Sequence, residues 1–564
     1  MRSATRPGAR NAAPRGPRSI LIDRRDFVRI LAIQAAAWSL GCGKREAARD
    51  GAGAGGAAGT GAATGAAAAA KPVRIPSNPF EGLWLGDDFD SGHRMRDAAL
   101  LLGDVDRVAP APAVDVVVVG GGISGLVAAR ALAKAGRVVR LVEQASALGG
   151  NAKSVRWGET EYAIGAAYFC RPDAGSELET LYREIGALDR GVKVKKGEAL
   201  FDGKLLEGFW EGTLDPANAA ATRRVRDEWR AIYEERYPAI PWVEGESAWT
   251  RAEYEAADAK PFARYLDEIG APPLVRTFCE YYCWSSFGAS AAEISTYAAL
   301  NFITAEFGEI LAMPGGNAGV AKLLADDLTA RRVALHPMTI VLAVTRRAGG
   351  VEVVARRGQA TLRFPCRACV IATPRFMSPY LIGNFPKERV TLIEQMKWRA
   401  YVVANILLAK RPAPVWYDAY RLDALDPKTC GWTDLILADY VASEKEGTAV
   451  LTAYRALPYD MGRAELILPE SYAQHQAAVR RDIAKWLPAL GLSASDVFDV
   501  NLARWGHPLV VAQPGQLSSG RLEALSAPLG AITFAHQDRY GVPAIETAID
   551  AGLAAAREAQ TLLV

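Results

Sequence analysis

The chain has 564 residues, half of them hydrophobic, with a formal net charge of +3 at pH 7. This length is sufficient for two domains with large cores, which excludes a small binding module. Residues 1–29 contain eight arginines and two aspartates, a net +6. The rest of the chain therefore carries about −3 and has no basic excess that would indicate nucleic-acid binding.

Cysteine and histidine usage indicates neither a disulfide framework nor a metal site. The seven cysteines are few and unevenly spaced, and the five histidines show no spacing typical of metal ligands. Cys366 and Cys369 form a CxxC pair, but they have no second pair and no neighbouring histidine cluster. A structural role is favoured over a metal or redox role. We therefore predict no metal site.

Residues 1–42 are predicted to be a targeting segment rather than part of a fold. An arginine-rich lead ends in Asp23-Arg24-Arg25-Asp26-Phe27 and continues into the mildly apolar run 30–40. This pattern resembles a twin-arginine export signal, and the apolar run is too short for a stable membrane span. We expect the export machinery as a partner and a periplasmic location. Cys42 follows Ser39-Leu40-Gly41, as in a degraded lipoprotein cleavage site, so a lipid anchor there remains an alternative.

A tether and an irregular arm follow the targeting segment. The tether is predicted over 43–70, because every residue from Gly51 to Ala70 is glycine, alanine or threonine and such a composition has almost no side chain to bury. The arm, 71–112, contains Pro72, Pro76 and Pro79 and an aromatic patch at Phe80 and Trp84. Because aromatic side chains in a free linker would be costly exposed surface, we expect the arm to lie across the folded body.

The first predicted strand turns through glycines directly into a helix. The run 116–119 is apolar on both faces, as in a central parallel strand, and 126–135 supply the helix. Between them, Gly120 fits a tight turn, Gly122 a close backbone approach to a pyrophosphate, and Gly125 close packing of helix on strand. The pattern predicts a dinucleotide site on the amino terminus of this helix.

A second strand supports this prediction against the alternative of an ordinary glycine turn. It covers 137–142 and ends at Glu143, 21 residues after Gly122. An acid at this distance binds a ribose hydroxyl in dinucleotide-binding folds. Only one such fingerprint is present, so a pyridine nucleotide is the weaker alternative to a single tightly held dinucleotide.

Further segments follow in a set order along the chain. They are Leu148-Gly149-Gly150-Asn151 with 162–168, Met313-Pro314-Gly315-Gly316 before a helix at 320–328, strand-like runs at 341–344, 350–354 and 368–374, and Phe534-Ala535-His536-Gln537-Asp538 before Pro543-Ala544-Ile545-Glu546. From about residue 113 to its end, the chain resembles the FAD-dependent amine oxidase and phytoene desaturase superfamily.

The resemblance implies an α/β fold: a Rossmann-like FAD-binding domain with an inserted α+β substrate domain. The FAD-binding domain would comprise 113–205, 313–390 and 501–564, and the substrate domain 206–312 and 391–500. The first insertion has helical patterns at 223–237, 261–269, 273–284 and 291–307. The second opens with a strand-like run at 401–408 and includes a helical pattern at 471–487.

The resemblance also implies the cofactor and its contacts. FAD is expected to be bound noncovalently, since no cysteine stands where we can match a flavin-linking residue. The expected contacts are Gly120, Gly122, Ile123, Ser124, Gly125, Glu143, Gly149, Gly150, Asn151, Gly315, Gly316, Val341, Thr373, Pro374, His536, Asp538, Ala544 and Ile545. His536 replaces a glycine common after Phe-Ala and is expected beside the ribityl chain.

The sequence departs from amine oxidases of this superfamily at their aromatic cage. The two cage positions fall at Ala544-Ile545 and near Val511-Ala512. The lysine that those enzymes commonly hold beside the flavin falls near Ala404, and Lys397 lies outside the strand. These departures do not affect the fold prediction, but they argue against an assignment to simple amine oxidation.

Candidate substrate and catalytic residues come from two aromatic-rich stretches and the strand after the glycine pair. Tyr168, Tyr281 and Trp284 are candidates for substrate contact, although aromatics at helical spacing are more often core. Trp505 and His507 precede the last motif, where the family brings a segment toward the flavin. His507 is either a proton acceptor or a capped loop residue.

We expect an exported FAD-dependent oxidoreductase, amine oxidase-like, that takes hydride from a C–H bond of a small organic substrate. Electrons would pass to oxygen or another acceptor. One alternative is a desaturase of polyenes or other C–C bonds with the same fold. The other is a flavin-bearing binding or assembly protein without catalysis.

Overall fold

The computed structural model describes residues 75–89, 93, 105–195, 198–423, 426–442 and 447–563. All of them belong to one compact unit, Pro72–Val564. The predicted export signal, the tether, Cys42 and part of the arm lie outside the described residues. In the described part of the chain, no helix combines the length and the apolar character needed to cross a membrane.

A seven-stranded sheet contains the strand that the glycine motif predicts. Its order is β11-β3-β2-β14-β13-β12, and β20 also pairs with β14. Neighbours from β11 through β14 to β20 run parallel, whereas β12, β13 and β14 form an antiparallel meander. The strands are β2 (Val114–Val119), β3 (Val139–Val142), β11 (Ala334–His336), β12 (Ile340–Arg347), β13 (Gly350–Arg357), β14 (Ala360–Ile371) and β20 (Ile532–Phe534).

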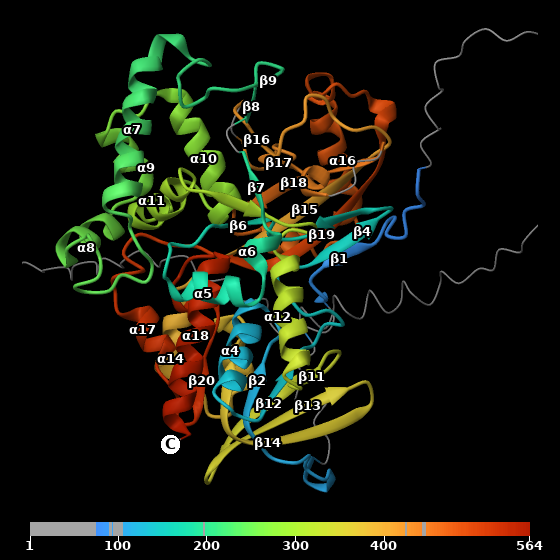
Figure 1. The fold of residues 1–564 in the computed structure, drawn as a ribbon, viewed down its shortest axis with the longest axis vertical. Coiled ribbons are helices and arrows are strands. Elements are labelled where there is room, and N and C mark those ends of the chain that lie inside the picture. Colours follow the sequence, from blue (N-terminus) through green and yellow to red (C-terminus); the bar gives the residue numbers. More distant parts are fainter. Residues whose placement is uncertain are drawn as a thin grey trace, which may run out of the picture. The chain divides into compact units, whose positions relative to one another are not determined.

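Three helices pack beside the parallel part of this sheet (Figure 1). They are α4 (Ile123–Lys134), α12 (Ala318–Ala330) and α18 (Ile545–Leu562). Residues 116–119 of β2 are almost completely buried, which explains their apolar character on both faces. Helix α18 approaches α4 closely at Gly552, where an added Cβ would lie 2.5 Å from the Ser124 carbonyl oxygen. The helix of the last predicted motif, α18, therefore packs against the helix of the first, α4.

An eight-stranded sheet has the order β1-β19-β15-β18-β17-β16-β8-β9. Its central strand β15 is buried along its whole length, and α16 (Ser471–Ala484) contributes to the core on one face. The strands are β1 (Trp84–Gly86), β8 (Glu198–Phe201), β9 (Lys204–Leu206), β15 (Trp398–Leu408), β16 (Asp418–Arg421), β17 (Asp434–Leu437), β18 (Ala449–Leu457) and β19 (Val497–Val510).

A group of helices adjoins this sheet and forms its own hydrophobic core (Figure 1). They are α7 (Ala219–Glu235), α8 (Arg251–Ala259), α9 (Phe262–Glu268), α10 (Pro273–Phe287) and α11 (Thr296–Ala305). The four helical patterns predicted in the first insertion are therefore present. Helix α11 begins later than the pattern suggested, because the Ser295 side chain accepts a hydrogen bond from the Ala298 amide (3.4 Å) and caps it there.

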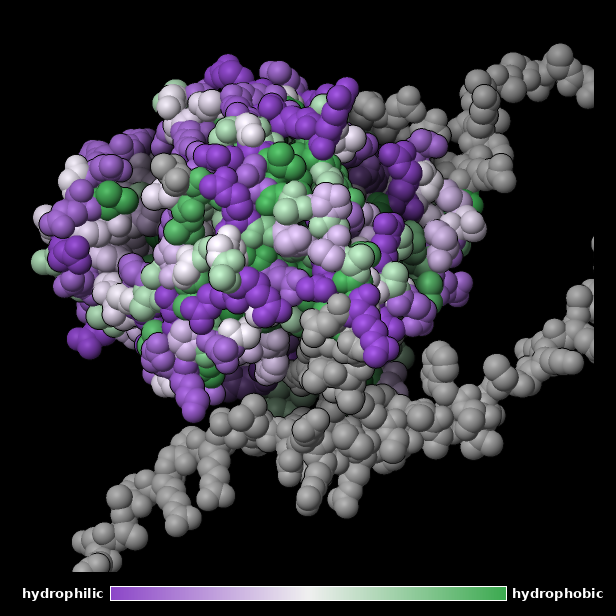
Figure 2. Space-filling model, turned by 90° about the horizontal axis from the view of Figure 1, so that it is seen from below, coloured by the Kyte–Doolittle hydropathy of each residue, from purple (hydrophilic) through white to green (hydrophobic). Residues whose placement is uncertain are grey.

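The remaining elements are short. They are β4 (Ser154–Trp157), β5 (Thr160–Ala163), β6 (Tyr168–Cys170), β7 (Val192–Val194), β10 (Ile310–Ala312), α5 (Glu177–Glu184), α6 (Ala187–Arg190), α13 (Ser378–Leu381), α14 (Lys387–Glu394), α15 (Gly462–Glu465) and α17 (Arg521–Ser526). Figure 2 shows the molecule from the end that carries β12–β14, with hydrophilic residues around the periphery of this face and hydrophobic residues gathered near its middle.

Three features differ from or refine the sequence analysis. Of the two alternatives for His507, that of a capped loop residue is wrong: His507 lies on β19, which continues its antiparallel pairing with β15 as far as Val510. The described part of the arm lies on the body as expected, because β1 pairs in parallel with 502–504 of β19. Strands β8 and β9 belong to the eight-stranded sheet, although the domain boundaries placed them in the FAD-binding part.

Candidate functional site

The turn between β2 and α4 has the geometry that its glycines predict. Gly120 has a φ of 108°, which side chains rarely allow, and an added Cβ would lie 2.8 Å from the Ala372 carbonyl oxygen. A Cβ on Gly125 would lie only 1.9 Å from the Gly120 carbonyl oxygen. Helix and strand can therefore approach each other here only if both positions are glycine.

Glu143 is fixed against this turn. One carboxylate oxygen accepts the Gly121 amide (2.7 Å), and the other accepts the Ala145 amide (2.8 Å). Each oxygen keeps a second lone pair. The acid is therefore already oriented beside the glycine turn and can accept a further hydroxyl donor.

The amino terminus of α4 is open to an anion. Its capping residue, Gly122, has no side chain, so the first amides of the helix, beginning at Ile123 and Ser124, have no side-chain cap. Gly150 lies opposite with a φ of 62°, and a Cβ on Gly122 would meet the Gly150 Cα at 3.6 Å. A helix terminus that only backbone and glycines surround fits a pyrophosphate.

Thr373 adds a polar group at the same place. It follows β14 and lies beside Gly120, whose added Cβ would be 3.4 Å from the Thr373 Cγ2. Its hydroxyl is buried and has no hydrogen-bond partner within the described residues. A buried hydroxyl normally has a partner, so this atom fits a dinucleotide contact. Pro374 follows it directly.

The second glycine pair, Gly315 and Gly316, closes the other side of the site. Both have positive φ, 75° and 65°. A Cβ on Gly316 would lie 2.7 Å from the Ala166 carbonyl oxygen. This loop therefore packs directly on the segment that follows β5. Val341, predicted to lie near the adenosine, is buried in β12.

The last motif provides another open helix terminus. Ala544 caps α18 without a side-chain hydrogen bond, and Ile545 is its first residue. The Asp538 carboxylate is buried and accepts the Arg375 amide (2.8 Å) and the Trp398 indole N–H (3.3 Å). Burial alone raises the pKa of Asp538, but His536 and Arg375 hold it below its ordinary value. Asp538 therefore fixes the Arg375 backbone and the Trp398 indole beside this motif.

Gln537 is a residue of this motif that the sequence analysis missed. Its side-chain amide donates to the Pro508 carbonyl oxygen (2.7 Å), which the Asn151 side-chain amide also approaches (3.5 Å). Gln537 and Asn151 thus converge on the backbone beside His507. His536 itself is half-buried, and its ring nitrogen Nδ1 accepts the Asp538 amide (3.2 Å).

A bridging segment, residues 163–168, joins the nucleotide-binding loops to the eight-stranded sheet. Five consecutive carbonyl oxygens of this segment accept hydrogen bonds. The donors are Asn405 Nδ2 to Ala163 (3.0 Å), Trp505 Nε1 to Ile164 (2.6 Å), Tyr454 Oη to Gly165 (3.0 Å), the Asn317 amide to Ala166 (3.0 Å) and Tyr417 Oη to Ala167 (3.4 Å). The segment is held rigidly, and four of its five donors are side chains of the eight-stranded sheet or of loops adjoining it.

These contacts define the positions of the two predicted catalytic residues. Trp505 is buried and uses its only polar atom to hold Ile164, so it positions the bridging segment. His507 is half-buried, with its ring centroid 4.5 Å from that of Phe376. Its proposed role as a proton acceptor stays a prediction.

An interior acidic cluster lies at the end of the bridging segment. The hydroxyls of Tyr168 and Tyr282 both donate to one carboxylate oxygen of Glu306 (3.4 and 2.9 Å). Burial, then Glu306, Asp418 and Asp434, raise the pKa of Tyr168 well above its ordinary value. Three carboxylates therefore act on one tyrosine hydroxyl in the interior.

Two more tyrosines belong to this cluster. Burial, then Tyr168 and the same three carboxylates, raise the pKa of Tyr420 well above its ordinary value. The Ser285 hydroxyl contacts the Tyr401 hydroxyl (3.0 Å) and donates to Asp434 (2.8 Å). We define the interior acidic cluster by its members, which are Tyr168, Tyr282, Ser285, Tyr401, Tyr420, Glu306, Asp418 and Asp434.

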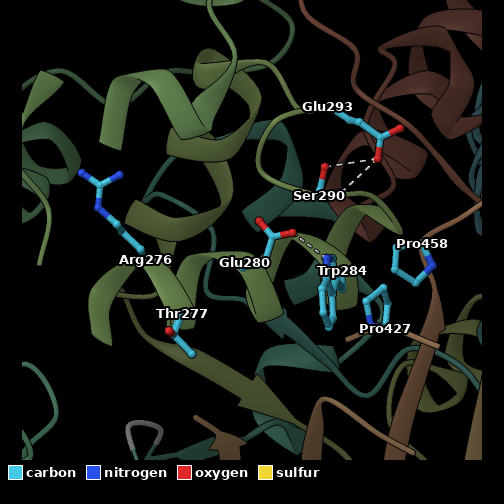
Figure 3. Close-up of a pocket in the computed structure, with 8 residues that line it drawn as sticks. All are labelled: Arg276, Thr277, Glu280, Trp284, Ser290, Glu293, Pro427 and Pro458. Atoms are coloured by element: carbon cyan, nitrogen blue, oxygen red, sulfur yellow. Dashed lines mark hydrogen bonds between the residues drawn. The ribbon is translucent and has the colours of Figure 1, made fainter. Parts of the chain in front are cut away.

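The other predicted substrate residues face elsewhere. The Tyr281 hydroxyl donates to Asp423 (3.0 Å), and the Trp284 indole N–H donates to Glu280 (2.8 Å). Trp284 lines a separate pocket, shown in Figure 3. Of the three predicted substrate residues, only Tyr168 contacts Glu306 in the interior acidic cluster.

The buried cysteines are poor candidates for chemistry. Burial raises the pKa of the Cys369 thiol well above its ordinary value and that of Cys366 to about 12, so both are protonated at neutral pH. Over the described residues, no group of three or more histidine, cysteine or acidic side chains could hold a metal ion.

Two open helix termini, paired glycine loops and an oriented acid define a dinucleotide-binding oxidoreductase fold with a second, eight-stranded sheet. The chain matches the model of the family described as flavin containing amine oxidoreductase over residues 123–560. It belongs to that family. It is an FAD-dependent oxidoreductase with the predicted mixed α/β fold, and the residues around α4 and α18 fit the cofactor.

Individual relatives agree with this assignment. Oxidoreductase PigB of Serratia sp. is 24% identical over 515 residues, covering 80% of this chain and 75% of that protein. Among solved structures, putrescine oxidase bound to putrescine has a TM-score of 0.62 at 17% identity, covering 80% of this chain and all of that one. Cyclohexylamine oxidase from Brevibacterium oxydans has a TM-score of 0.59 at 20% identity, with the same coverage. The solved structures establish the fold alone.

Proposed function

We propose that this protein oxidises a small organic amine, taking hydride from the carbon that bears the nitrogen and passing electrons to oxygen or another acceptor. The observation that carries this proposal is the interior acidic cluster. Glu306, Asp418 and Asp434 act together on Tyr168, which is the last residue of the bridging segment. A protonated amine is a substrate group that such a cluster favours.

The electrostatic argument rests on burial. Asp418 and Asp434 are 1% and 4% exposed, and charges interact more strongly in such an environment than in water. Several carboxylates placed together favour a cation over a neutral or anionic molecule. The tyrosine hydroxyls stay protonated because their pKa values are raised, so they can donate to the carboxylates or accept from an ammonium group.

The chain's own residues would orient the substrate and take up its proton. FAD, when bound, supplies the acceptor for the hydride. A protonated primary amine loses one hydride and one proton and leaves as an iminium, which water hydrolyses to a carbonyl compound and ammonium. Glu306, which two tyrosine hydroxyls hold, would bind the ammonium group and receive that proton.

The family supports an amine, but one observation favours a second candidate. The positions where amine oxidases carry their aromatic cage hold Val511 and Ala512, both fully buried, and Ala544 with Ile545. A desaturase of the same fold would act on a C–C bond with no need for such a cage. The two candidates differ in whether the substrate must carry a positive charge.

The Glu306→Gln variant distinguishes these candidates. Glutamine keeps an oxygen for Tyr168 and Tyr282 but removes the charge, so we expect KM for an amine substrate to rise by at least roughly 10-fold while flavin content is unchanged. The Glu244→Gln variant, at an exposed carboxylate (77% exposed side chain), is the matched control. An unchanged KM in Glu306→Gln would contradict the assignment of the ammonium group to this cluster.

Export remains a separate proposal, supported by the sequence of residues 1–42. We propose that Arg24 and Arg25 direct the folded protein out of the cytoplasm, to a periplasmic location. Replacing both with lysine should retain the full chain in the cytoplasm, as cell fractionation would show. Unchanged secretion would mean that residues 1–70 are only a leader. A lipid anchor at Cys42 predicts in addition that Cys42→Ala releases the protein from membranes.

A further inference from the structure

A second concave site lies against α10 and involves none of the predicted cofactor residues. It has a volume of about 570 Å3, within the range typical of small-molecule sites. Its walls come from α10, from the loop before α11, and from the loops after β16 and β18 (Figure 3). The lining residues are Arg276, Thr277, Glu280, Trp284, Ser290, Glu293, Pro427 and Pro458. We call it the α10 pocket.

The carboxylate of Glu280 is the central polar group of this pocket. It accepts the Trp284 indole N–H (2.8 Å) and the Ala291 amide (2.9 Å). In the described part of the chain it forms no ion pair with a lysine, arginine or histidine. Burial raises the pKa of Glu280, and neighbouring Glu293 raises it further. Glu280 is half-buried, and a partly desolvated carboxylate is stabilised by a cation, so a cationic ligand would supply what the chain does not.

The arginine of the pocket does not fill this role. Arg276 donates to the carbonyl oxygens of Ala271 (2.7 Å) and Leu266 (3.0 Å) and pairs with Asp267. In Figure 3 its guanidinium group points away from Glu280 and Trp284. Arg276 therefore contributes its aliphatic stem to the wall, while its charge is used outside the pocket.

The charges around Glu293 are already balanced. Glu293 and Asp460 share the Arg399 guanidinium (3.0 and 3.2 Å), and Lys397 lies 3.9 Å from Glu293. Lys397 pairs with Glu293 rather than with Glu280. Among the described residues, the pocket thus contains one carboxylate without a cationic partner, Glu280, beside one whose charge is balanced, Glu293.

The remaining wall is apolar. Trp284 is 4% exposed, and its indole is held in place by the bond to Glu280. Pro427 and Pro458 lie on the same side of the pocket as the indole (Figure 3). An indole beside a carboxylate suits an ammonium group with an apolar body, because the ring face attracts cations and the rings cover the apolar part.

We propose that the α10 pocket binds a small organic cation, with its ammonium group against Glu280 and its apolar body against Trp284 and the two prolines. This site is separate from the interior acidic cluster, because α10 directs Tyr282 and Ser285 to that cluster and Glu280 and Trp284 to the pocket. The proposal stands whether or not the cluster binds an amine substrate.

Isothermal titration calorimetry of the full, FAD-loaded chain tests the proposal with benzyltrimethylammonium, and with benzyl alcohol as the neutral probe. We expect saturable binding of the cation, at least 10-fold weaker binding of the alcohol, and no change in the flavin absorbance spectrum. Glu280→Gln should weaken cation binding at least 10-fold, because it keeps an acceptor for Trp284 but removes the charge. The Glu244→Gln control should bind like the wild type.

A second variant covers the case in which Glu280→Gln does not fold. Thr277→Phe fills the pocket without changing its charge and should also abolish binding, while flavin content reports folding. Absence of saturable binding to the wild type would overturn the proposal. So would wild-type affinity in both variants. Loss of binding in Glu306→Gln, with Glu280→Gln unaffected, would place the cation in the interior acidic cluster instead and would equally overturn it.

Discussion

Replacing Gly122 with alanine separates cofactor binding from folding. Gly122 has a φ of −71°, which alanine adopts readily, and the new methyl group would meet the Gly150 Cα at an ordinary 3.6 Å. The apoprotein should therefore lose no more than about 1 kcal/mol of unfolding free energy. If FAD is held as expected, the same methyl group would stand where the pyrophosphate approaches the open terminus of α4. Loss of one or two charge-assisted hydrogen bonds, about 3 kcal/mol, weakens FAD binding roughly 100-fold.

The assay is a fluorescence titration of apoprotein with FAD, together with denaturant unfolding of the same samples. Gly383→Ala is the matched control, because its Cβ would meet nothing closer than 3.9 Å and the residue lies outside the site. Gly125→Ala is the contrasting variant: its Cβ would lie 1.9 Å from the Gly120 carbonyl oxygen, so it should lose about 1–3 kcal/mol of stability as well as FAD. Wild-type FAD affinity in Gly122→Ala would refute the assignment of the pyrophosphate to this terminus.

Three further predictions concern buried polar groups. Burial raises the pKa of Asp550 to about 6, so ionisation of Asp550 opposes folding. Between pH 4 and pH 7 the unfolding free energy of the wild type should fall by up to about 3 kcal/mol, whereas that of Asp550→Asn should not. Parallel curves of unfolding free energy against pH for the two proteins would contradict this. Burial lowers the pKa of His475 to about 3, so the unfolded state takes up a proton first on acidification. Stability should fall by about 2 kcal/mol from pH 7 to pH 5 in the wild type but not in His475→Gln, as urea unfolding at both pH values would show. Tyr454→Phe leaves the Gly165 carbonyl without its donor and should cost about 1–3 kcal/mol in thermal unfolding, whereas an unchanged melting temperature would mean that this bond is dispensable.

The cofactor half of the site could be predicted because its signals are local. A strand, a glycine turn and a helix follow one another within 20 residues of Gly120, and backbone geometry alone dictates where glycine is required. Glu143 was found for the same reason, since it directly follows the neighbouring strand β3. Asp538 was also singled out, but its bonds to Arg375 and Trp398 depend on segments over a hundred residues away.

The interior acidic cluster could not be predicted, because its members come together only in the fold. Tyr168, Glu306 and Asp434 lie on β6, after α11 and on β17, and each alone is an ordinary residue of its segment. A carboxylate at the end of the apolar α11 was the one available signal. Tyr281 and Tyr282 are adjacent on α10, yet only Tyr282 donates to Glu306. Sequence pattern located the helix but not the direction of each side chain.

Anaerobic reduction of the bound flavin tests the proposed amine oxidation most directly. The purified chain should carry one noncovalent FAD, released intact by acid precipitation. It should then be mixed without oxygen with monoamines, putrescine, amino acids and polyenes, and the flavin absorbance recorded. We predict rapid bleaching by at least one amine, with the rate lowered in Glu306→Gln. Bleaching by a polyene alone, or by none of these compounds while photoreduction proceeds normally, would contradict the proposed function.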